Sequence, residues 1–294
     1  MTYRGRFAPS PTGPLHFGSL VAAVASWLDA RACGGEWHVR IEDVDQPRVV
    51  SGADSHILRT LETLGLHWDG EVVYQSARLE RYDAALERLR GAGQVYRCRC
   101  SRREIADSAV QGIEGAIYPG TCREREVPAS EPAAERVIAP DDTIRFDDRV
   151  QGPIAQRIAR DIGDFVLKRR DGLHAYQLAV VVDDAEAGIT DIVRGADLLW
   201  STPRQIGLQR SLGLGTPRYL HVPLAADRTG EKLSKQTHAP PVDVRNGTHE
   251  LRRVLRFLGQ RVDDDGSLAE ILEQARTSWD AGLIPRRSAI AVTD

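Results

Sequence analysis

This 294-residue chain lacks any apolar run long enough to cross a lipid bilayer. Residues 1–7 also lack the basic segment and apolar core of a secretory signal, and they alternate like the start of a strand. We therefore expect a cytoplasmic protein with no membrane partner. The net charge is only -3, which excludes the coating of nucleic acid by bulk attraction, so any such contact must use local patches.

Cysteine is scarce, and three of the four cysteines fall within one short stretch, at Cys98, Cys100 and Cys122. In a chain without a secretory signal, such a group favours a metal over disulfides. The fourth, Cys33, lies apart on a predicted helix, and we expect it in the hydrophobic core.

Strand and helix signals alternate through the first ninety or so residues. The predicted order is a strand at Tyr3–Ala8, a helix over residues 20–32, a half-buried strand at Glu36–Glu42, and helices after Ser51 and Ser76. This order predicts an α/β fold built on a doubly wound parallel sheet.

Periodicity weakens between Gln111 and Asp148, where we expect a loop-rich insertion, and residues after Pro241 indicate a purely helical segment. We divide the chain into two halves of one sheet domain, residues 1–94 and 164–240, an insertion at 95–163, and a C-terminal segment at 241–294. The predicted helix caps are Ser101, Thr202, Thr248 and Ser267.

Proline and glycine gather in the loop Pro9–Ser19, between the first strand and the first helix. Its small residues let the backbone approach a ligand, and the helix start beyond Gly18 offers unpaired N–H groups and a partial positive charge suited to phosphate. His16 could donate a hydrogen bond to phosphoryl oxygens there. The alternative is a proline-rich turn in which Ser19 caps the helix.

A second loop, Lys232-Leu-Ser-Lys-Gln236, follows a predicted strand at Tyr219–Val222. Lys232 and Lys235 could neutralise the charge that builds on a departing pyrophosphate. By itself such a loop is more typical of a solvated surface. Together with His16-Phe-Gly-Ser19, however, it resembles the paired HIGH and KMSKS signatures of the class I aminoacyl-tRNA synthetases.

This resemblance implies a Rossmann-like catalytic domain that uses ATP with Mg²⁺ and forms no covalent enzyme intermediate. Catalysis would come from positioning and from charge stabilisation. The implied catalytic residues are His16, Gly18, Lys232 and Lys235. The implied ATP-binding residues are Pro9, His16, Gly18, Ser19 and Lys235.

Two further motifs, Arg6-Phe-Ala-Pro-Ser10 and Arg40-Ile-Glu-Asp-Val-Asp-Gln-Pro-Arg48, resemble the glutamate-specific synthetases. L-Glutamate needs cations for its carboxylates and an anion for its ammonium group. Glu42 ends its strand, where open α/β sheets hold ligands, whereas Arg40 fits the solvated face of that strand. The implied glutamate-binding set is Arg6, Phe7, Ala8, Pro9, Ser10, Glu42, Tyr176 and Arg194, with Arg6 and Arg194 as the cations, Glu42 as the anion and Tyr176 as a hydroxyl group.

The match covers roughly the first 240 residues, and only about fifty remain after Pro241, where a full glutamyl-tRNA synthetase continues into a large anticodon-binding region. In this, and in the motif Gly13-Pro-Leu-His-Phe-Gly-Ser-Leu20, the chain resembles the truncated glutamyl-queuosine tRNA(Asp) synthetases. That family implies transfer of glutamate from glutamyl-adenylate to the modified base queuosine of tRNA(Asp). A minimal glutamyl-tRNA synthetase that charges a tRNA 3′ end is the alternative.

The same resemblance completes the ligand set for one structural Zn²⁺ per chain. Three cysteines leave a tetrahedral site one ligand short, and no histidine occurs between His67 and His174. The family places Tyr118 in the fourth position, beside Cys98, Cys100 and Cys122. Three reduced thiols without a metal are the alternative.

Two other functions compete with this interpretation: a nucleotidyltransferase that never meets RNA, and a catalytically silent protein used for binding. The first has no reason to carry the glutamate set, and the intact signature loops argue against the second. We expect a monomer. Two groups of arginines are candidates for tRNA phosphate contacts or simply solvated faces: Arg97, Arg99, Arg102 and Arg103, and Arg252, Arg253 and Arg256.

Overall fold

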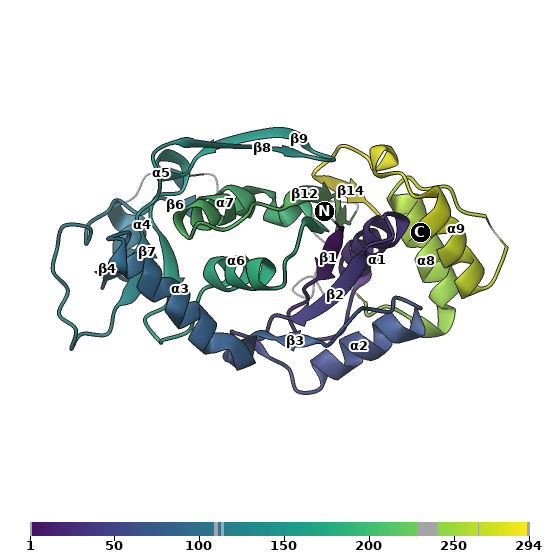
Figure 1. Ribbon diagram of the computed structural model, residues 1–294, viewed down its shortest axis with the longest axis horizontal. Coiled ribbons are helices and arrows are strands. Elements are labelled where there is room, and N and C mark those ends of the chain that lie inside the picture. Colours follow the sequence, from purple (N-terminus) through teal and green to yellow (C-terminus); the bar gives the residue numbers. More distant parts are fainter. Residues whose placement is uncertain (1, 109–110, 113–114, 228–239, 264, 293–294) are drawn as a thin grey trace.

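Parallel strands form the centre of the molecule in the computed structural model, which describes all residues except 1, 109–110, 113–114, 228–239, 264 and 293–294 (Figure 1). The strands β1 (Arg4–Phe7), β2 (Glu36–Ile41) and β3 (Val73–Tyr74) pair in parallel, as do β11 (Asp191–Gly195) and β12 (Arg218–Val222). The Thr190 N–H donates to the Arg4 carbonyl over 2.9 Å, so β1 and β11 begin side by side. Their carboxyl ends therefore share one edge.

Helices cover both faces of these strands (Figure 1). On one face, Val193 and Leu220 pack into a core with α1 (Phe17–Ala32), α8 (Gly247–Phe257) and α9 (Leu268–Ser278). On the other, Ile192 and Tyr219 pack with α3 (Leu79–Gly91), α6 (Tyr176–Glu186) and α7 (Thr202–Ser211). The predicted doubly wound α/β fold is confirmed.

The remaining elements surround this body. They are α2 (Ala53–Thr63), β4 (Val95–Cys98), α4 (Arg102–Ser108), β5 (Gln111–Gly112), β6 (Gly115–Ala116), β7 (Ala134–Val137), β8 (Thr143–Asp148), β9 (Gly152–Arg157), α5 (Ile158–Asp161), β10 (Phe165–Lys168), β13 (Leu224–Ala226), β14 (Ala289–Ala291), and 3₁₀ turns at Gln46–Arg48, Gln75–Arg78, Ala196–Ser201, Val244–Asn246 and Ala281–Leu283. No helix within the described ranges is long and apolar enough to span a bilayer.

The insertion is more regular than its sequence predicts. β7 pairs antiparallel with both β4 and β10, and β8 and β9 form a hairpin that extends along the molecule beside α7 (Figure 1). The hairpin joins the central strands where Asp148 pairs with Tyr219 of β12. The prediction of loops up to Asp148 was therefore wrong in part, because short strands with one solvated face carry few apolar residues.

Three predictions near helix ends also fail. Cys33 is exposed at the end of α1, and Thr248 lies inside α8, which begins at Gly247. Thr202 continues a 3₁₀ turn and makes no capping hydrogen bond. The capping boxes at Ser101 and Ser267 are confirmed.

The C-terminal segment is not purely helical, since β14 pairs in parallel with β13. Local sequence could not reveal this strand, because its partner lies some sixty residues earlier in the chain. The same segment shares the core of α1, and the Trp279 indole donates to buried Asp29 over 3.0 Å.

Candidate active site

The loop after β1 lies at the carboxyl edge of the sheet. The Glu42 N–H, just beyond β2, donates to the Pro9 carbonyl over 2.9 Å. Phe7 is buried in a stack against Trp37, with ring centroids 6.2 Å apart, so only its backbone can serve a ligand. Ser10 is exposed and its carbonyl accepts from Thr12 over 2.9 Å, which keeps the loop tightly turned.

His16, and not Ser19, is the N-cap of α1. Its Nδ1 accepts the Ser19 N–H over 3.3 Å. Because Nδ1 accepts, a neutral His16 carries its proton on Nε2 and can donate from there. Among the described residues, no hydrogen-bond partner occurs for the N–H groups of Phe17 and Gly18. The helix start therefore has the features of an anion site.

Lys232 and Lys235 lie outside the described residues, but both flanks of their segment are described. β13 ends at Ala226, next to the carboxyl edge of the sheet. On the other side, Pro241 forms a bridge with His16, and the Val242 N–H donates to the Leu15 carbonyl over 2.9 Å. The described residues that follow this segment therefore lie directly beside the first loop.

A buried charge cluster lies where β1 and β2 meet α6. Asp184 of α6 accepts from Arg6 through Nε at 3.1 Å and Nη2 at 3.3 Å, and from Arg40 Nη1 at 2.6 Å. Arg40 Nη2 also donates to Glu42 over 3.2 Å. Arg40 is only 4% exposed, so its assignment to a solvated strand face was wrong. A doubly wound sheet is covered on both faces, and here α6 supplies the acid.

Asp183 forms a second layer beneath this cluster. Its carboxylate accepts from Gln75 at 2.7 Å, Arg78 at 2.7 Å and Tyr82 at 2.8 Å. Neither Asp183 nor its neighbour Asp184 was among the predicted site residues. The signal was present, since two acids that directly continue the apolar run Leu178–Val182 on one helix require buried partners.

Arg194, the penultimate residue of β11, is 5% exposed, yet all its hydrogen-bond partners are neutral. Its Nε donates to His221 over 3.0 Å, Nη1 to the Tyr176 hydroxyl over 3.4 Å, and Nη2 to Thr202 over 2.8 Å. In the described part of the chain, no carboxylate forms an ion pair with this guanidinium. Four hydrogen bonds, including one to the Leu198 carbonyl, leave one Nη1–H for a ligand.

The electrostatics differ between the acids of the site. Burial raises the pKa of Glu42, and the charges of Arg40 and Arg6 offset this only in part. Burial acts in the same direction on Asp184, but there Arg40 and Arg6 prevail and lower the pKa. Burial also raises the pKa of the Tyr176 phenol, on which Arg194, Glu42 and Arg6 all act, so these groups share one neighbourhood.

The cysteines of the insertion form a compact cluster. The sulfur atoms of Cys98, Cys100 and Cys122 lie within 4.8 Å of one another, a grouping that could hold a metal ion. The Tyr118 hydroxyl lies 3.3 Å from Cys98 Sγ and 3.6 Å from Cys100 Sγ. Burial raises the pKa of Cys122, but hydrogen bonds from Tyr118 and from the Arg99 backbone outweigh it and bring the pKa to about 7. The predicted ligands thus converge on one point.

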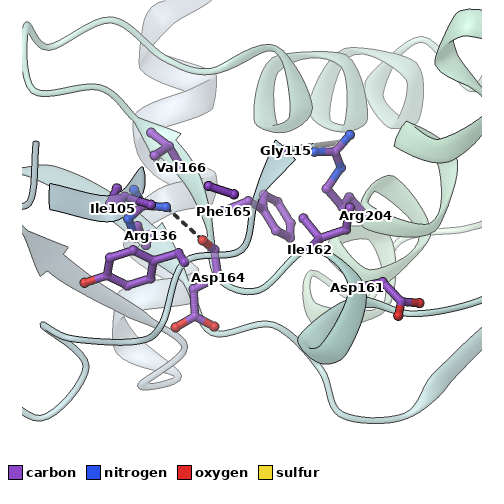
Figure 2. A pocket seen from close by; sticks show the side chains of 11 residues that line it. Ile105, Gly115, Arg136, Asp161, Ile162, Asp164, Phe165, Val166 and Arg204 are labelled. Carbon is purple, nitrogen blue, oxygen red and sulfur yellow. Dashed lines mark hydrogen bonds between the residues drawn. The ribbon is translucent and has the colours of Figure 1, made fainter. Parts of the chain in front are cut away.

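A cavity of about 220 Å³ adjoins this cluster, since Tyr118 is among its lining residues (Figure 2). Its acidic wall is already satisfied, because Asp164 accepts from Tyr96 at 2.6 Å, Arg123 at 2.6 Å and the Ala139 N–H at 2.8 Å. Arg136 donates to the Asp164 carbonyl and stacks 4.0 Å from the Tyr118 ring. Residues of both the insertion and the sheet domain line the cavity, and none of them belongs to the charge cluster.

The arginine groups are partly committed to the fold. Arg253 stacks 4.7 Å over Phe17 and pairs with Glu250 at 3.3 Å. Arg252 donates to the Asp263 carbonyl over 3.1 Å, and Arg97 donates to the Glu131 carbonyl. Phosphate contacts by these groups stay a prediction.

Comparison with known proteins fits this fold and this site. The family model "tRNA synthetases class I (E and Q), catalytic domain" matches residues 2–258, so the chain belongs to this family of enzymes. The glutamate-tRNA synthetase of Elizabethkingia anophelis superposes with a TM-score of 0.81 at 25% identity, covering 100% of this chain and 68% of that one. A glutamate tRNA ligase from Elizabethkingia meningosepticum, solved in complex with its amino acid, gives a TM-score of 0.80 at 25% identity, with 100% and 67% covered.

Nearer relatives share almost the full length of the chain. The glutamyl-Q tRNA(Asp) synthetase of Dechloromonas aromatica is 57% identical over 98% of this chain and 97% of its own. The protein of the same name from Neisseria meningitidis is 52% identical over 97% of this chain and 98% of its own. Within the class I synthetases, the chain groups with the glutamyl-Q tRNA(Asp) synthetases, and the resemblance drawn from its motifs is confirmed.

Proposed function

We propose that this enzyme uses ATP to activate L-glutamate as glutamyl-adenylate and then transfers the glutamyl group to queuosine in the anticodon of tRNA(Asp). The observation that carries the proposal is Arg194, a buried cation whose hydrogen-bond partners in the described ranges are all neutral. A buried charge is stable when it is paired, so this guanidinium is suited to the side-chain carboxylate of glutamate. The names of the near-full-length relatives support the same substrates.

In this proposal the substrate spans the charge cluster. Arg194 and the Tyr176 hydroxyl hold the side-chain carboxylate, and Glu42 holds the ammonium group. Arg6 directs Nε and Nη2 toward Asp184, so its Nη1 edge can serve the other carboxylate. These contacts fix the α-carboxylate in the pose for attack on ATP, which is the main contribution of binding sites to such reactions.

ATP then lies across the loop of residues 8–19. The open N–H groups of Phe17 and Gly18 and the Nε2–H of His16 point donors toward the phosphates, with Pro9 and Ser19 beside them. The glutamate α-carboxylate oxygen attacks the α-phosphorus, the bond to the β-phosphate oxygen breaks, and Mg-pyrophosphate leaves. Lys232 and Lys235 would neutralise the charge of that leaving group.

Glutamate-dependent exchange of pyrophosphate into ATP tests the activation step. We expect Lys235→Ala to reduce the exchange rate about a hundredfold or more, the typical effect of removing one preorganised transition-state donor. Lys168→Ala is the matched control, since Lys168 pairs with Asp83 away from the site. Equal rates in the two variants would remove Lys235 from the mechanism.

The acceptor is tested with tRNA(Asp) prepared with and without queuosine, and with its terminal ribose removed or intact. Glutamylation that needs queuosine and survives loss of the 3′ end supports the proposal. Glutamylation that needs only the intact 3′ end would instead identify a minimal glutamyl-tRNA synthetase. Transfer should weaken as salt rises, because the tRNA is held largely through its phosphates.

We propose further that Cys98, Cys100, Cys122 and Tyr118 hold one structural Zn²⁺. Their donor set of three sulfurs and one phenol oxygen fits the tetrahedral preference of zinc. Elemental analysis should find about one zinc per chain, lost or weakened in Cys98→Ala and retained in the exposed control Cys33→Ala. A fully active preparation without metal contradicts this site.

The remaining proposals are a cytoplasmic location and a monomeric state. Light scattering on the purified protein should give a mass near the 32.5 kDa of one chain. A mass of twice that value would show a dimer.

A further inference from the structure

Two buried residues that the mechanism above does not use stand behind Arg194. His221 of β12 is the direct register partner of Arg194 on β11, and Asp148 ends the adjacent strand β8. The Asp148 carboxylate lies 2.6 Å from His221 Nδ1, and His221 Nε2 lies 3.0 Å from Arg194 Nε. The side chains of His221 and Asp148 are both fully buried.

The order of these atoms determines where the protons lie. Arg194 Nε can only donate, so His221 Nε2 must be the acceptor, and the imidazole proton then lies on Nδ1 and points at Asp148. His221 is therefore neutral. Burial lowers its pKa to about 4 despite the neighbouring carboxylate of Asp148, which agrees with this geometry.

Asp148 is itself held rigidly. Its Oδ1 accepts the backbone N–H groups of Val150 at 3.0 Å, Gln151 at 2.8 Å and His221 at 3.2 Å. Burial would raise the pKa of this carboxyl group, but the hydrogen bonds and the His221 ring outweigh it and lower the pKa. The carboxylate thus stays ionised with Oδ2 aimed at the imidazole.

The neutral ring has a specific consequence for Arg194. A carboxylate in direct contact would orient the guanidinium and also neutralise it, as Asp184 does for Arg6 and Arg40. With one imidazole between them, Asp148 orients Arg194 while the cation keeps its charge for a ligand. The ring is in turn fixed by its stack on Tyr219, with centroids 6.2 Å apart.

We propose that Asp148 and His221 are positioning residues that orient the Arg194 guanidinium and so set the selectivity for an acidic side chain on the amino-acid substrate. This inference rests on the proposed function, because it assigns Arg194 to the glutamate side chain. Neither residue touches the substrate.

Asp148→Asn is the sharpest test, since it keeps shape and volume and changes one atom. The amide donates to His221 Nδ1, which forces the imidazole proton onto Nε2, where it opposes the Arg194 N–H. A carboxylate-to-amide change behind a histidine acts through the wrong tautomer in this way. We expect the KM for glutamate to rise about tenfold to a hundredfold, with kcat and the KM for ATP changing much less. Discrimination between glutamate and glutamine should shrink with it.

Two further variants separate positioning from folding. His221→Gln places an acceptor oxygen near the old Nε2 position and should therefore keep most of the affinity for glutamate. His221→Phe removes that acceptor and should resemble Asp148→Asn. The matched control is Asp29→Asn, an equally buried carboxylate bound by Arg149 at 2.5 Å and Trp279 at 3.0 Å. It should lower the melting temperature and leave the KM for glutamate unchanged.

Exchange kinetics with wild type and all four variants decide the matter. A wild-type protein whose exchange does not depend on glutamate overturns the proposed function itself. Glutamate-dependent exchange in wild type, with an unchanged KM in both Asp148→Asn and His221→Phe, overturns only the positioning role. Equal KM increases in Asp29→Asn and Asp148→Asn also overturn the positioning role, because they would reflect general loosening of the fold.

Discussion

Two sets of buried arginines lie at the same sheet edge and are held in opposite ways. Arg6 and Arg40 meet carboxylates directly, with Asp184 between them and Glu42 beside Arg40. Arg194 meets an imidazole, two hydroxyls and a carbonyl, and Asp148 contacts that imidazole from the other side.

The difference distinguishes Arg40, which supports the fold, from Arg194, which is held ready for a ligand. A buried cation paired with an acid has already recovered its desolvation cost within the fold, so its removal leaves an uncompensated charge. A buried cation among neutral acceptors recovers that cost fully only when an anion arrives. Arg194 should therefore matter most for activity, and Arg40 most for stability.

The largest expected effect is the loss of activity when Arg194 is replaced. Arg194→Met should reduce kcat/KM for glutamate in the exchange reaction on the order of a hundredfold to a thousandfold, because it leaves a substrate carboxylate without its partner. The free energy of unfolding should change by less than about 2 kcal/mol, the cost of the neutral acceptors left behind. If the variant binds glutamate normally, the comparison fails.

The next effect concerns stability. Arg40→Met removes the ion-pair partner of the largely buried Glu42 and leaves Asp184 with Arg6. We expect the free energy of unfolding in urea to fall by about 3 kcal/mol or more. Arg48→Met, in the same motif, is the control, since Arg48 is 73% exposed and its pair with Asp45 should contribute less than about 1 kcal/mol. Comparable losses in Arg40→Met and Arg194→Met would show that both arginines are structural.

The glutamate-binding residues at this sheet edge were predicted from the sequence, whereas the acids that support the arginines were not. Glu42, Tyr176 and Arg194 were predicted from the resemblance to the glutamate-specific synthetases, and the structure places them close together. Their supporting acids could not be predicted, because the partners lie far apart in sequence, such as Arg6 and Asp184 at a separation of 178 residues.

Arg40 shows the physical reason most plainly. Alternation on β2 predicted a strand with one solvated face, while the order of the elements predicted helices on both faces of the sheet. The second prediction excludes the first, and the acids that end the apolar run of α6 supply the partner of Arg40. His221 was overlooked for a related reason, since its role appears only when β8, β11 and β12 are aligned.

A smaller effect should appear in the pH dependence. Burial raises the pKa of Glu42 above its ordinary 4.5, so Glu42 takes up a proton at a higher pH than a free glutamate side chain does. The protonated group cannot hold an ammonium. The KM for glutamate should therefore rise on the acid side with a midpoint above 4.5, by about tenfold per pH unit below the midpoint, as for one titrating group. A KM that stays level down to the ordinary value would show that Glu42 does not bind the ammonium group.

The smallest expected effect is a rise in the free energy of unfolding in a variant that binds glutamate less tightly. The folded-state pKa of Glu42 is raised, so its contribution to stability is greatest below 4.5 and declines as pH rises through the folded value. Glu42→Gln removes the buried charge and keeps an oxygen for Arg40, so at neutral pH it should raise the free energy of unfolding on the order of 1 kcal/mol while weakening glutamate binding.

Asp184→Asn is the opposing variant. The pKa of Asp184 is lowered, so its contribution is present above the ordinary 3.8 and is lost as pH falls through the folded value. Its replacement should therefore destabilise the protein at neutral pH. The two substitutions would then change the free energy of unfolding in opposite directions, although both acids contact Arg40. This outcome follows only if Glu42 serves a ligand and Asp184 serves the fold.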